Sequence, residues 1–148
     1  MESEFVNWLR ARVPSHPLVP IGIGDDAALL SLASGKCVVT SDMLMDGVDF
    51  VLNDCDPRRI GRKSLAVNLS DLAAMAAKPV AAIVSLAVPT DVSLEVMKMI
   101  YEGVLEMADE FGVALAGGDT NSWKHPLAIS VTAIGEPTKR GVLMRGGA

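Results

Sequence analysis

The feature that most constrains the fold of this chain is a run of eleven residues without a charge, Pro79–Pro89, with a proline at each end. The run is far shorter than the roughly 20 apolar residues that span a bilayer. Its Val, Ile, Leu and Ala side chains are typical of a strand that is buried on both faces. The run therefore predicts a core strand and gives no sign of a membrane segment.

Two long helices are expected on either side of this strand. The pair Asp56–Pro57 is a strong helix start, because a capping side chain is followed by a proline at the first helical position. We expect this helix to run to about Lys78, where the next proline ends it. Asp91 or Ser93 is expected to cap the second helix, which ends near Gly112.

Weaker patterns predict the remaining elements. These are a first helix over Glu2–Val13, a hairpin of Ala27–Leu32 and Lys36–Ser41, a short strand at Val48–Leu52, and strands at Ala114–Ala116 and Leu127–Ile134. Strands mixed with two long helices indicate one domain of the α+β or α/β class. The tail Met144–Ala148 has no closing element, so we expect the chain to stop at a domain boundary.

Composition argues against several classes of protein. Half of the 148 residues are hydrophobic, which excludes intrinsic disorder. The net charge is −5 and no Lys/Arg cluster occurs, so we expect neither a nucleic acid nor a membrane as partner. The first residues do not resemble a signal peptide, and two cysteines predict free thiols, so we expect a cytoplasmic protein. A mean hydropathy of +0.36 suggests that a second copy, or another part of the same polypeptide, covers apolar surface.

Several carboxylates stand at the ends of expected strands, where rigid scaffolds place chemistry. Asp25 and Asp26 follow a Gly-Ile-Gly turn, Asp42 closes a strand, and Asp119 follows two glycines. Asp71 instead lies within the first long helix. At about 100° per residue it shares one polar face with Ser64 and Asn68.

Each of these carboxylates also has a plain structural explanation. Turn chemistry accounts for Gly-Asp-Asp and Gly-Gly-Asp-Thr, and a solvated helix face accounts for Asp71. Taken together, they have few basic neighbours in the sequence and would repel one another if they met. Oxygen ligands without Cys or His favour Mg²⁺ or Mn²⁺ rather than Zn²⁺.

Rival motifs fail on their context. Gly22–Ala27 matches the dinucleotide pattern G-x-G-x-x-A, but prolines precede it, a strand-like segment follows it, and its two aspartates would repel a pyrophosphate. The sequence contains no phosphate-binding G-x-x-x-x-G-K-[ST] loop and no Gly-x-Ser-x-Gly elbow. His16 and His125 each stand next to a proline and are interpreted as loop residues.

Four motifs occur in register: Gly22–Ala28, Thr40–Phe50, Asn68–Met75 and Gly117–Thr120. In this order they strongly resemble the N-terminal half of the thiamine-monophosphate kinase family, and the similarity runs to Arg145. That family belongs with aminoimidazole ribonucleotide synthetase, selenophosphate synthetase and a hydrogenase-maturation protein. The resemblance implies an α+β fold like the N-terminal domain of aminoimidazole ribonucleotide synthetase, with a mixed or antiparallel sheet flanked by two long helices. In a homodimer the two sheets pair into a barrel. Residues 1–148 would be the ATP- and Mg-binding N-terminal domain, and the C-terminal domain of the family is absent from this chain.

The resemblance also implies a reaction and a set of site residues. The family transfers the γ-phosphoryl group of ATP to thiamine monophosphate, giving thiamine diphosphate and ADP, with several Mg²⁺ ions. Its metal positions fall on Asp26, Thr40, Ser41, Asp42, Asp71 and Asp119, and its ATP contacts on Tyr101, Gly118, Asp119 and Arg145. Asp49 stands where the family usually has a His associated with the acceptor substrate. No general base is assigned, because the attacking phosphate oxygen is already ionised at neutral pH.

Three functions remain open from the sequence. The first is the kinase, whose isolated N-terminal domain would be inactive alone. The second is another enzyme of the same ATP-binding superfamily with a different acceptor. The third is a non-catalytic, metal-binding dimerisation module.

Overall fold

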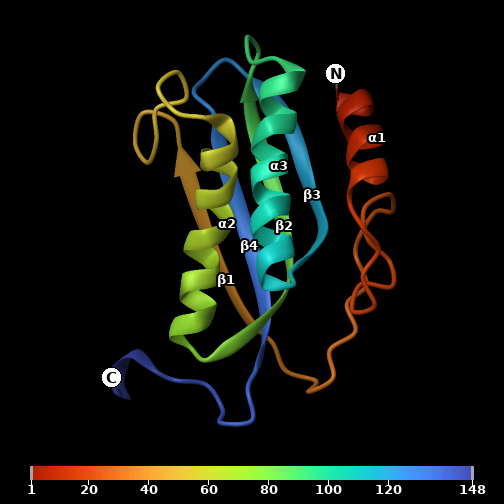
Figure 1. The fold of residues 1–148 in the computed structure, drawn as a ribbon, viewed down its shortest axis with the longest axis vertical. Helices are drawn as coiled ribbons and strands as arrows, with labels where there is room; N and C mark the ends of the chain where they lie inside the picture. The colour runs from red at the N-terminus through yellow and green to blue at the C-terminus, as the bar shows by residue number, and fades with distance from the viewer. Residues whose placement is uncertain (1, 148) are drawn as a thin grey trace.

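The computed structural model describes residues 2–147 and builds them around one mixed four-stranded sheet (Figure 1). Its strands are β1 (Val38–Met45), β2 (Ala77–Pro89), β3 (Ala114–Trp123) and β4 (Ala128–Pro137), and its helices are α1 (Glu2–Arg12), α2 (Pro57–Ala74), α3 (Leu94–Phe111) and the short 3₁₀ helix η1 (Arg145–Gly147). The strand order is β1-β4-β2-β3; β4 is antiparallel to both β1 and β2, and β2 is parallel to β3. The predicted α+β class and mixed sheet are confirmed.

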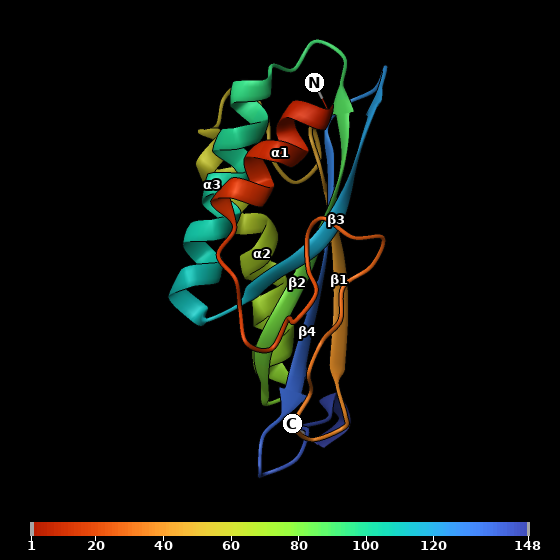
Figure 2. The same ribbon diagram turned by 90° about the vertical axis from the view of Figure 1, so that its right-hand side faces the viewer.

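Helices α2 and α3 lie side by side on one face of the sheet (Figures 1 and 2). Their starts are those predicted: Asp56 accepts a hydrogen bond from the backbone N–H of Arg58, and Ser93 accepts one from Val96. Gly112 ends α3 with a φ of 65°, a left-handed conformation that suits glycine.

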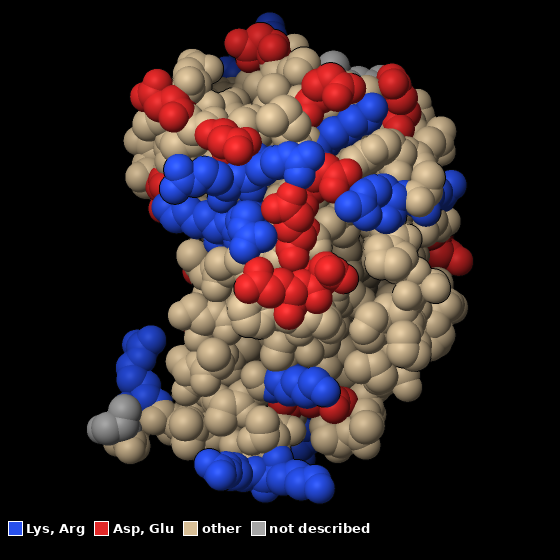
Figure 3. All heavy atoms as spheres, in the orientation of Figure 1, with Lys and Arg blue, Asp and Glu red and all other residues tan. Residues whose placement is uncertain are grey.

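The two helices approach closely because a glycine stands on each side of the contact. A Cβ atom added to Gly61 would overlap the carbonyl oxygen of Ile100, and one added to Gly103 would overlap that of Arg58. Ion pairs between α2 and α3, including Arg62–Glu110 at 3.0 Å, cover the outside of this contact. Figure 3 shows these basic and acidic side chains gathered together over the helical face.

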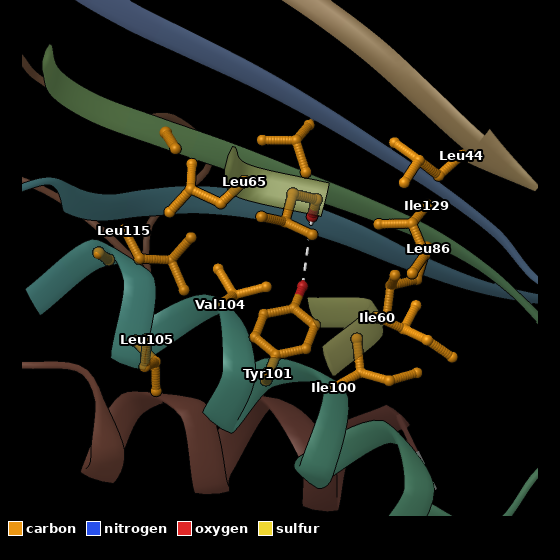
Figure 4. Close-up of a cluster of buried hydrophobic side chains, with 14 of the residues drawn as sticks. Leu44, Ile60, Leu65, Leu86, Ile100, Tyr101, Val104, Leu105, Leu115 and Ile129 are labelled. Carbon is orange, nitrogen blue, oxygen red and sulfur yellow. Dashed lines mark hydrogen bonds between the residues drawn. The ribbon is translucent and has the colours of Figure 1, made fainter. Parts of the chain in front are cut away.

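The two faces of the sheet differ in burial. On the helix side, Leu44, Val84 and Ile129 pack with residues of α2 and α3 into the core (Figure 4). On the other face, apolar side chains are exposed, among them Met43 at 60% and Val39 at 56%. The open face therefore presents the kind of apolar surface that the mean hydropathy suggested.

The predicted ends of α2 and β2 were wrong. The helix stops at Ala74 and not near Lys78, Ala76 takes a left-handed φ of 54°, and β2 begins at Ala77. Pro79 lies inside the strand and not at its boundary. The pairing of β2 with β4 shifts register between Pro79 and Ala81, and such an irregularity is where a strand accommodates a proline.

The predicted hairpin and the predicted strand at Val48–Leu52 were also wrong. Leu29 forms only an isolated bridge with Ile21, and β1 pairs along its whole length with the distant β4. In place of a strand at Val48–Leu52, a turn follows β1, and the N–H of Gly47 donates to the carbonyl of Phe50.

Helix α1 is held against α3 by contacts near its middle and its end. Phe5 is fully buried and makes an edge-to-face contact with Tyr101, with ring centroids 4.9 Å apart. Arg12 forms a two-pronged ion pair with Glu102. From α1 the chain passes across the edge strand β3 before it enters β1 (Figure 2). Among residues 2–147, no helix is long and apolar enough to cross a membrane.

Candidate functional site

A pocket of about 760 Å³ lies beside the edge strand β3. Its walls are residues of α1, the loop Gly22–Ala28, β2, β3 and Tyr101 of α3. The volume lies within the range of small-molecule sites, which is about 300–1,000 Å³. The pocket therefore brings together the motif Gly22–Ala28, the motif Gly117–Thr120 and helix α3.

The pocket is strongly acidic. Glu2, Asp25, Asp26 and Asp119 line it, and Arg10 is the only Lys or Arg among its described lining residues. Negative charges that face one pocket repel one another and would also repel an anionic ligand. Occupation of the pocket by an anionic ligand therefore calls for added positive charge.

Two glycines bring β3 close to β2 at the wall of this pocket. A Cβ atom at Gly118 would overlap the carbonyl oxygen of Val84, and one at Gly117 would lie 3.3 Å from the side chain of Ile83. Gly118 is thus required by packing, whatever else it does. The pair also leaves the backbone on the pocket side without side chains, where a ligand can approach closely.

Tyr101 reaches the pocket from the core side. Its ring is buried, and its hydroxyl donates a 3.3 Å hydrogen bond to the carbonyl oxygen of Val84 (Figure 4). Burial raises the pKa of Tyr101 well above its ordinary value, and the nearby charge of Asp119 raises it further. The phenol therefore stays protonated and acts as a neutral wall of the pocket.

A second polar group lies between α2 and β1, on the helix side of the sheet. Thr40 donates a 3.0 Å hydrogen bond to the carboxylate of Asp71, and Asp42 is two residues further along the same face of β1. Asn68 is one turn before Asp71 on α2 and is fully buried. Its amide nitrogen donates to the carbonyl of Ser64, but its Oδ1 has no hydrogen-bond partner among the described residues.

The donors of this second group fit an oxygen-binding cation. Thr40 and Asp71 bring a hydroxyl and a carboxylate into contact, and hard cations such as Mg²⁺ prefer such oxygen ligands. Buried polar atoms are nearly always paired, so an unpaired one calls for an explanation.

The structure does not bring the six predicted metal residues into one cluster. Strands β1 and β3 form opposite edges of the sheet, so Asp42 and Asp119 are separated by three interstrand spacings, roughly 14 Å. Ser41 points to the open face, where its hydroxyl accepts a hydrogen bond from Thr132. Within residues 2–147, no three His, Cys, Asp or Glu side chains lie close enough to hold one metal ion. A shared metal centre stays a prediction.

The other predicted residues are also placed. Arg145 begins η1 and is not among the residues that line the pocket. Asp49 uses its carboxylate to accept a 2.8 Å hydrogen bond from the N–H of Met45, and its backbone carbonyl accepts one from Lys63. Asp49 therefore closes the turn after β1, a structural use that its proposed substrate role does not require.

Sequence reasoning missed two residues. Arg10 enters the pocket only because α1 packs on α3, and no motif contains it. Asn68 was placed on the polar face of α2 but received no role. Its polarity within an otherwise apolar helix face was the available signal.

Comparison with known proteins finds one family across most of this chain. A family model described as AIR synthase related protein, N-terminal domain, covers residues 24–136. A thiamine-monophosphate kinase of Rhodopirellula baltica is 43% identical over 91% of this chain and 45% of its own length. A crystal structure of thiamine-monophosphate kinase from Stenotrophomonas maltophilia superposes with a TM-score of 0.81 at 41% identity, covering 94% of this chain and 43% of that one.

One similar structure carries ligands. It is described as AaThiL complexed with AMPPCP and TMP, with 29% identity and a TM-score of 0.67, and it covers 92% of this chain and 40% of that chain. The chain thus spans a little under half the length of the relatives that it matches.

Proposed function

Because this chain belongs to the AIR synthase related family, through that family's N-terminal domain, we propose that it is the ATP-binding part of a thiamine-monophosphate kinase. The observation that carries the proposal is the pocket beside β3. Three of the four expected ATP contacts, Tyr101, Gly118 and Asp119, line it together with Asp26, although they come from separate parts of the sequence.

The proposed reaction joins a phosphate oxygen of thiamine monophosphate to the γ-phosphorus of ATP and breaks the bond from that phosphorus to ADP. The products are thiamine diphosphate and ADP. The attacking oxygen is already ionised, so the protein has to position the two phosphates in line and neutralise their charge.

The proposal requires cations, because the pocket has four acidic side chains and a single basic one. Mg²⁺, when bound, would supply charge neutralisation and a fixed orientation of the phosphate oxygens. Asp26 and Asp119 in the pocket, with Asp42, Asp71 and Thr40 between α2 and β1, would hold such ions. Thr40 keeps the carboxylate of Asp71 oriented through its hydrogen bond.

The proposal includes a homodimer formed through the open face of the sheet. Val39, Met43, Met45 and Ile83 are exposed there, and pairing with the same face of a second copy would bury them. A reducing, cytoplasmic location agrees with two exposed free cysteines, Cys37 and Cys55. Light scattering should report the molar mass of a monomer for Met43→Glu. The control variant Glu95→Lys, on α3, should keep the molar mass of the dimer.

One observation favours a second candidate, an enzyme of the same superfamily with a different acceptor. Asp49 occupies the position at which the resemblance implies a substrate-contacting His, and its carboxylate is engaged with the backbone. Phosphorus NMR of the reaction products, with thiamine monophosphate as acceptor and the full-length protein as enzyme, separates the two candidates.

Calorimetric titration of this chain with the ATP analogue AMPPCP tests the nucleotide site. Binding is expected with Mg²⁺ and should be lost when the metal is chelated. Asp119→Asn should weaken the metal-dependent binding, while Asp91→Asn, at an exposed turn outside the pocket, serves as the control. Equal heats with and without Mg²⁺ would contradict the proposed role of the cation.

A further inference from the structure

Arg10 makes a specific contact with the first motif. Its Nη2 donates a 3.0 Å hydrogen bond to the carbonyl oxygen of Gly24, fourteen residues away. The guanidinium also lies against the glycine itself. A Cβ atom at Gly24 would stand 3.0 Å from Nε and 3.4 Å from Cζ of Arg10, and the φ of Gly24 is +125°. Both the conformation and the space at Gly24 therefore suit glycine.

The helix that carries Arg10 is firmly anchored. Phe5 and Leu9, on the buried side of α1, are in the core, and Arg12 is paired with Glu102 on α3. Arg10 itself is on the exposed side of α1, directed to the pocket. Its guanidinium is thus held by a rigid element, which is the condition for a side chain to hold a loop in place.

The loop that it contacts has few backbone pairings, although its Ile23 side chain packs against the core. Around Gly22–Ala28 the backbone makes only isolated bridges, between Ile21 and Leu29 and between Ile23 and Asp25. The two carboxylates of the motif follow Gly24 directly, and Asp26 lines the pocket. The hydrogen bond from Arg10 therefore meets the loop immediately before these two carboxylates.

We propose that Arg10 is a positioning residue that fixes the Asp25–Asp26 segment at the pocket, so that Asp26 can hold the cation that accompanies the nucleotide. The inference rests on the proposed nucleotide site. In this proposal Arg10 contacts the loop through the carbonyl of Gly24 and does not contact the phosphates of the nucleotide. A direct phosphate contact is the alternative that the experiment has to separate.

The experiment measures AMPPCP binding while the Mg²⁺ concentration is varied. Arg10→Ala should raise the Mg²⁺ concentration at half-maximal binding about tenfold, the effect of losing one hydrogen bond to a charged group, and should leave the affinity for AMPPCP at saturating Mg²⁺ unchanged. Arg10→Lys keeps the charge and a hydrogen-bond donor. Its Mg²⁺ concentration at half-maximal binding should therefore lie between those of Arg10→Ala and the wild type. Arg59→Ala removes the same charge from an exposed position of α2 outside the pocket and should not change the Mg²⁺ requirement.

Gly24→Ala disturbs the same contact, because its Cβ would displace the guanidinium, and it also strains the loop backbone at a φ of +125°. It should reproduce the effect of Arg10→Ala, and the double variant should be no worse than the poorer single variant. If the double variant raised the Mg²⁺ requirement by the product of the two single effects, the proposal would be overturned. An unchanged Mg²⁺ requirement in Arg10→Ala would also overturn it, as would a loss of AMPPCP affinity at saturating Mg²⁺, which would mean direct contact with phosphate.

Hydrogen exchange separates this inference from the proposed function. The amides of Asp25–Ala28 should exchange faster in Arg10→Ala than in the wild type, with no nucleotide present. If the wild type binds no nucleotide but this exchange difference is found, the proposed function fails and the positioning role of Arg10 is supported. Unchanged exchange at these amides contradicts the positioning role.

Discussion

Replacing Asn68 by leucine should stabilise the metal-free protein, although it removes a buried hydrogen bond. Asn68 is fully buried, and its Oδ1 has no partner among the residues described, which costs about 1–3 kcal/mol. The hydrogen bond from its amide nitrogen to the carbonyl of Ser64 contributes about 0.5–1.5 kcal/mol. Leucine has nearly the same shape, so the net gain is about 1 kcal/mol, or about 3 °C in the melting temperature of a chain of this length.

The assay is thermal unfolding, followed by circular dichroism, in a chelator and in Mg²⁺. In the chelator, Asn68→Leu should melt higher than the wild type, and in Mg²⁺ it should lose the stabilisation that the metal gives to the wild type. Ser64→Ala is the matched control, because that hydroxyl is buried and paired with the carbonyl of Gly61. It should melt lower and keep the Mg²⁺ response. A lower melting temperature of Asn68→Leu in the chelator, or an undiminished response to Mg²⁺, would refute the reasoning.

Three further predictions follow from the packing and the charges. Gly103→Ala should lower the free energy of unfolding by about 2–4 kcal/mol, since its Cβ would overlap the carbonyl of Arg58; an unchanged urea midpoint would exclude this close contact. Asp71→Asn should change the urea midpoint little, because the amide oxygen still accepts from Thr40, but should abolish Mg²⁺-dependent AMPPCP binding in calorimetry. Burial raises the pKa of Tyr101, so the unfolded chain loses this proton before the folded chain does, and the wild type should lose stability above about pH 10 more steeply than Tyr101→Phe. Parallel unfolding curves of the two proteins between pH 9 and 11 would count against this explanation.

The sequence predicted those parts of the fold that depend on neighbouring residues. Capping by Asp56 and the left-handed end at Gly112 are local effects and stand where they were expected, and Ser93 is the cap among the two candidates, Asp91 and Ser93. Pro79 misled the prediction, because a proline ends a helix and also fits a strand at a register shift. Whether Pro79 ends a helix or lies inside a strand depends on the pairing with β4, which the local sequence does not contain.

The pairing of β1 could not be predicted for the same reason. Its partner β4 lies about ninety residues later, and nothing near Val38 identifies that strand in the sequence. The sequence pattern therefore favours an apolar segment close by, Ala27–Leu32, as the partner.

For the site, the motifs identified the residues and the structure placed them. Thr40 and Asp71 are 31 residues apart in the chain and are hydrogen bonded, and Asp26 and Asp119 line one pocket. Sequence reasoning treated all the carboxylates as one group. It could not foresee that β1 and β3 become opposite edges of the sheet, because strand order is a property of the whole chain.

The docking of α1 has a consequence for the order in which the protein is completed during synthesis. Arg12 leaves the ribosome 90 residues before Glu102, its partner on α3. At roughly 5–20 residues per second, the first helix must wait roughly 5–18 s before the surface that receives it exists. Until then Phe5 and Leu9 have no core to enter, so nascent chains are expected to expose these two side chains to chaperones.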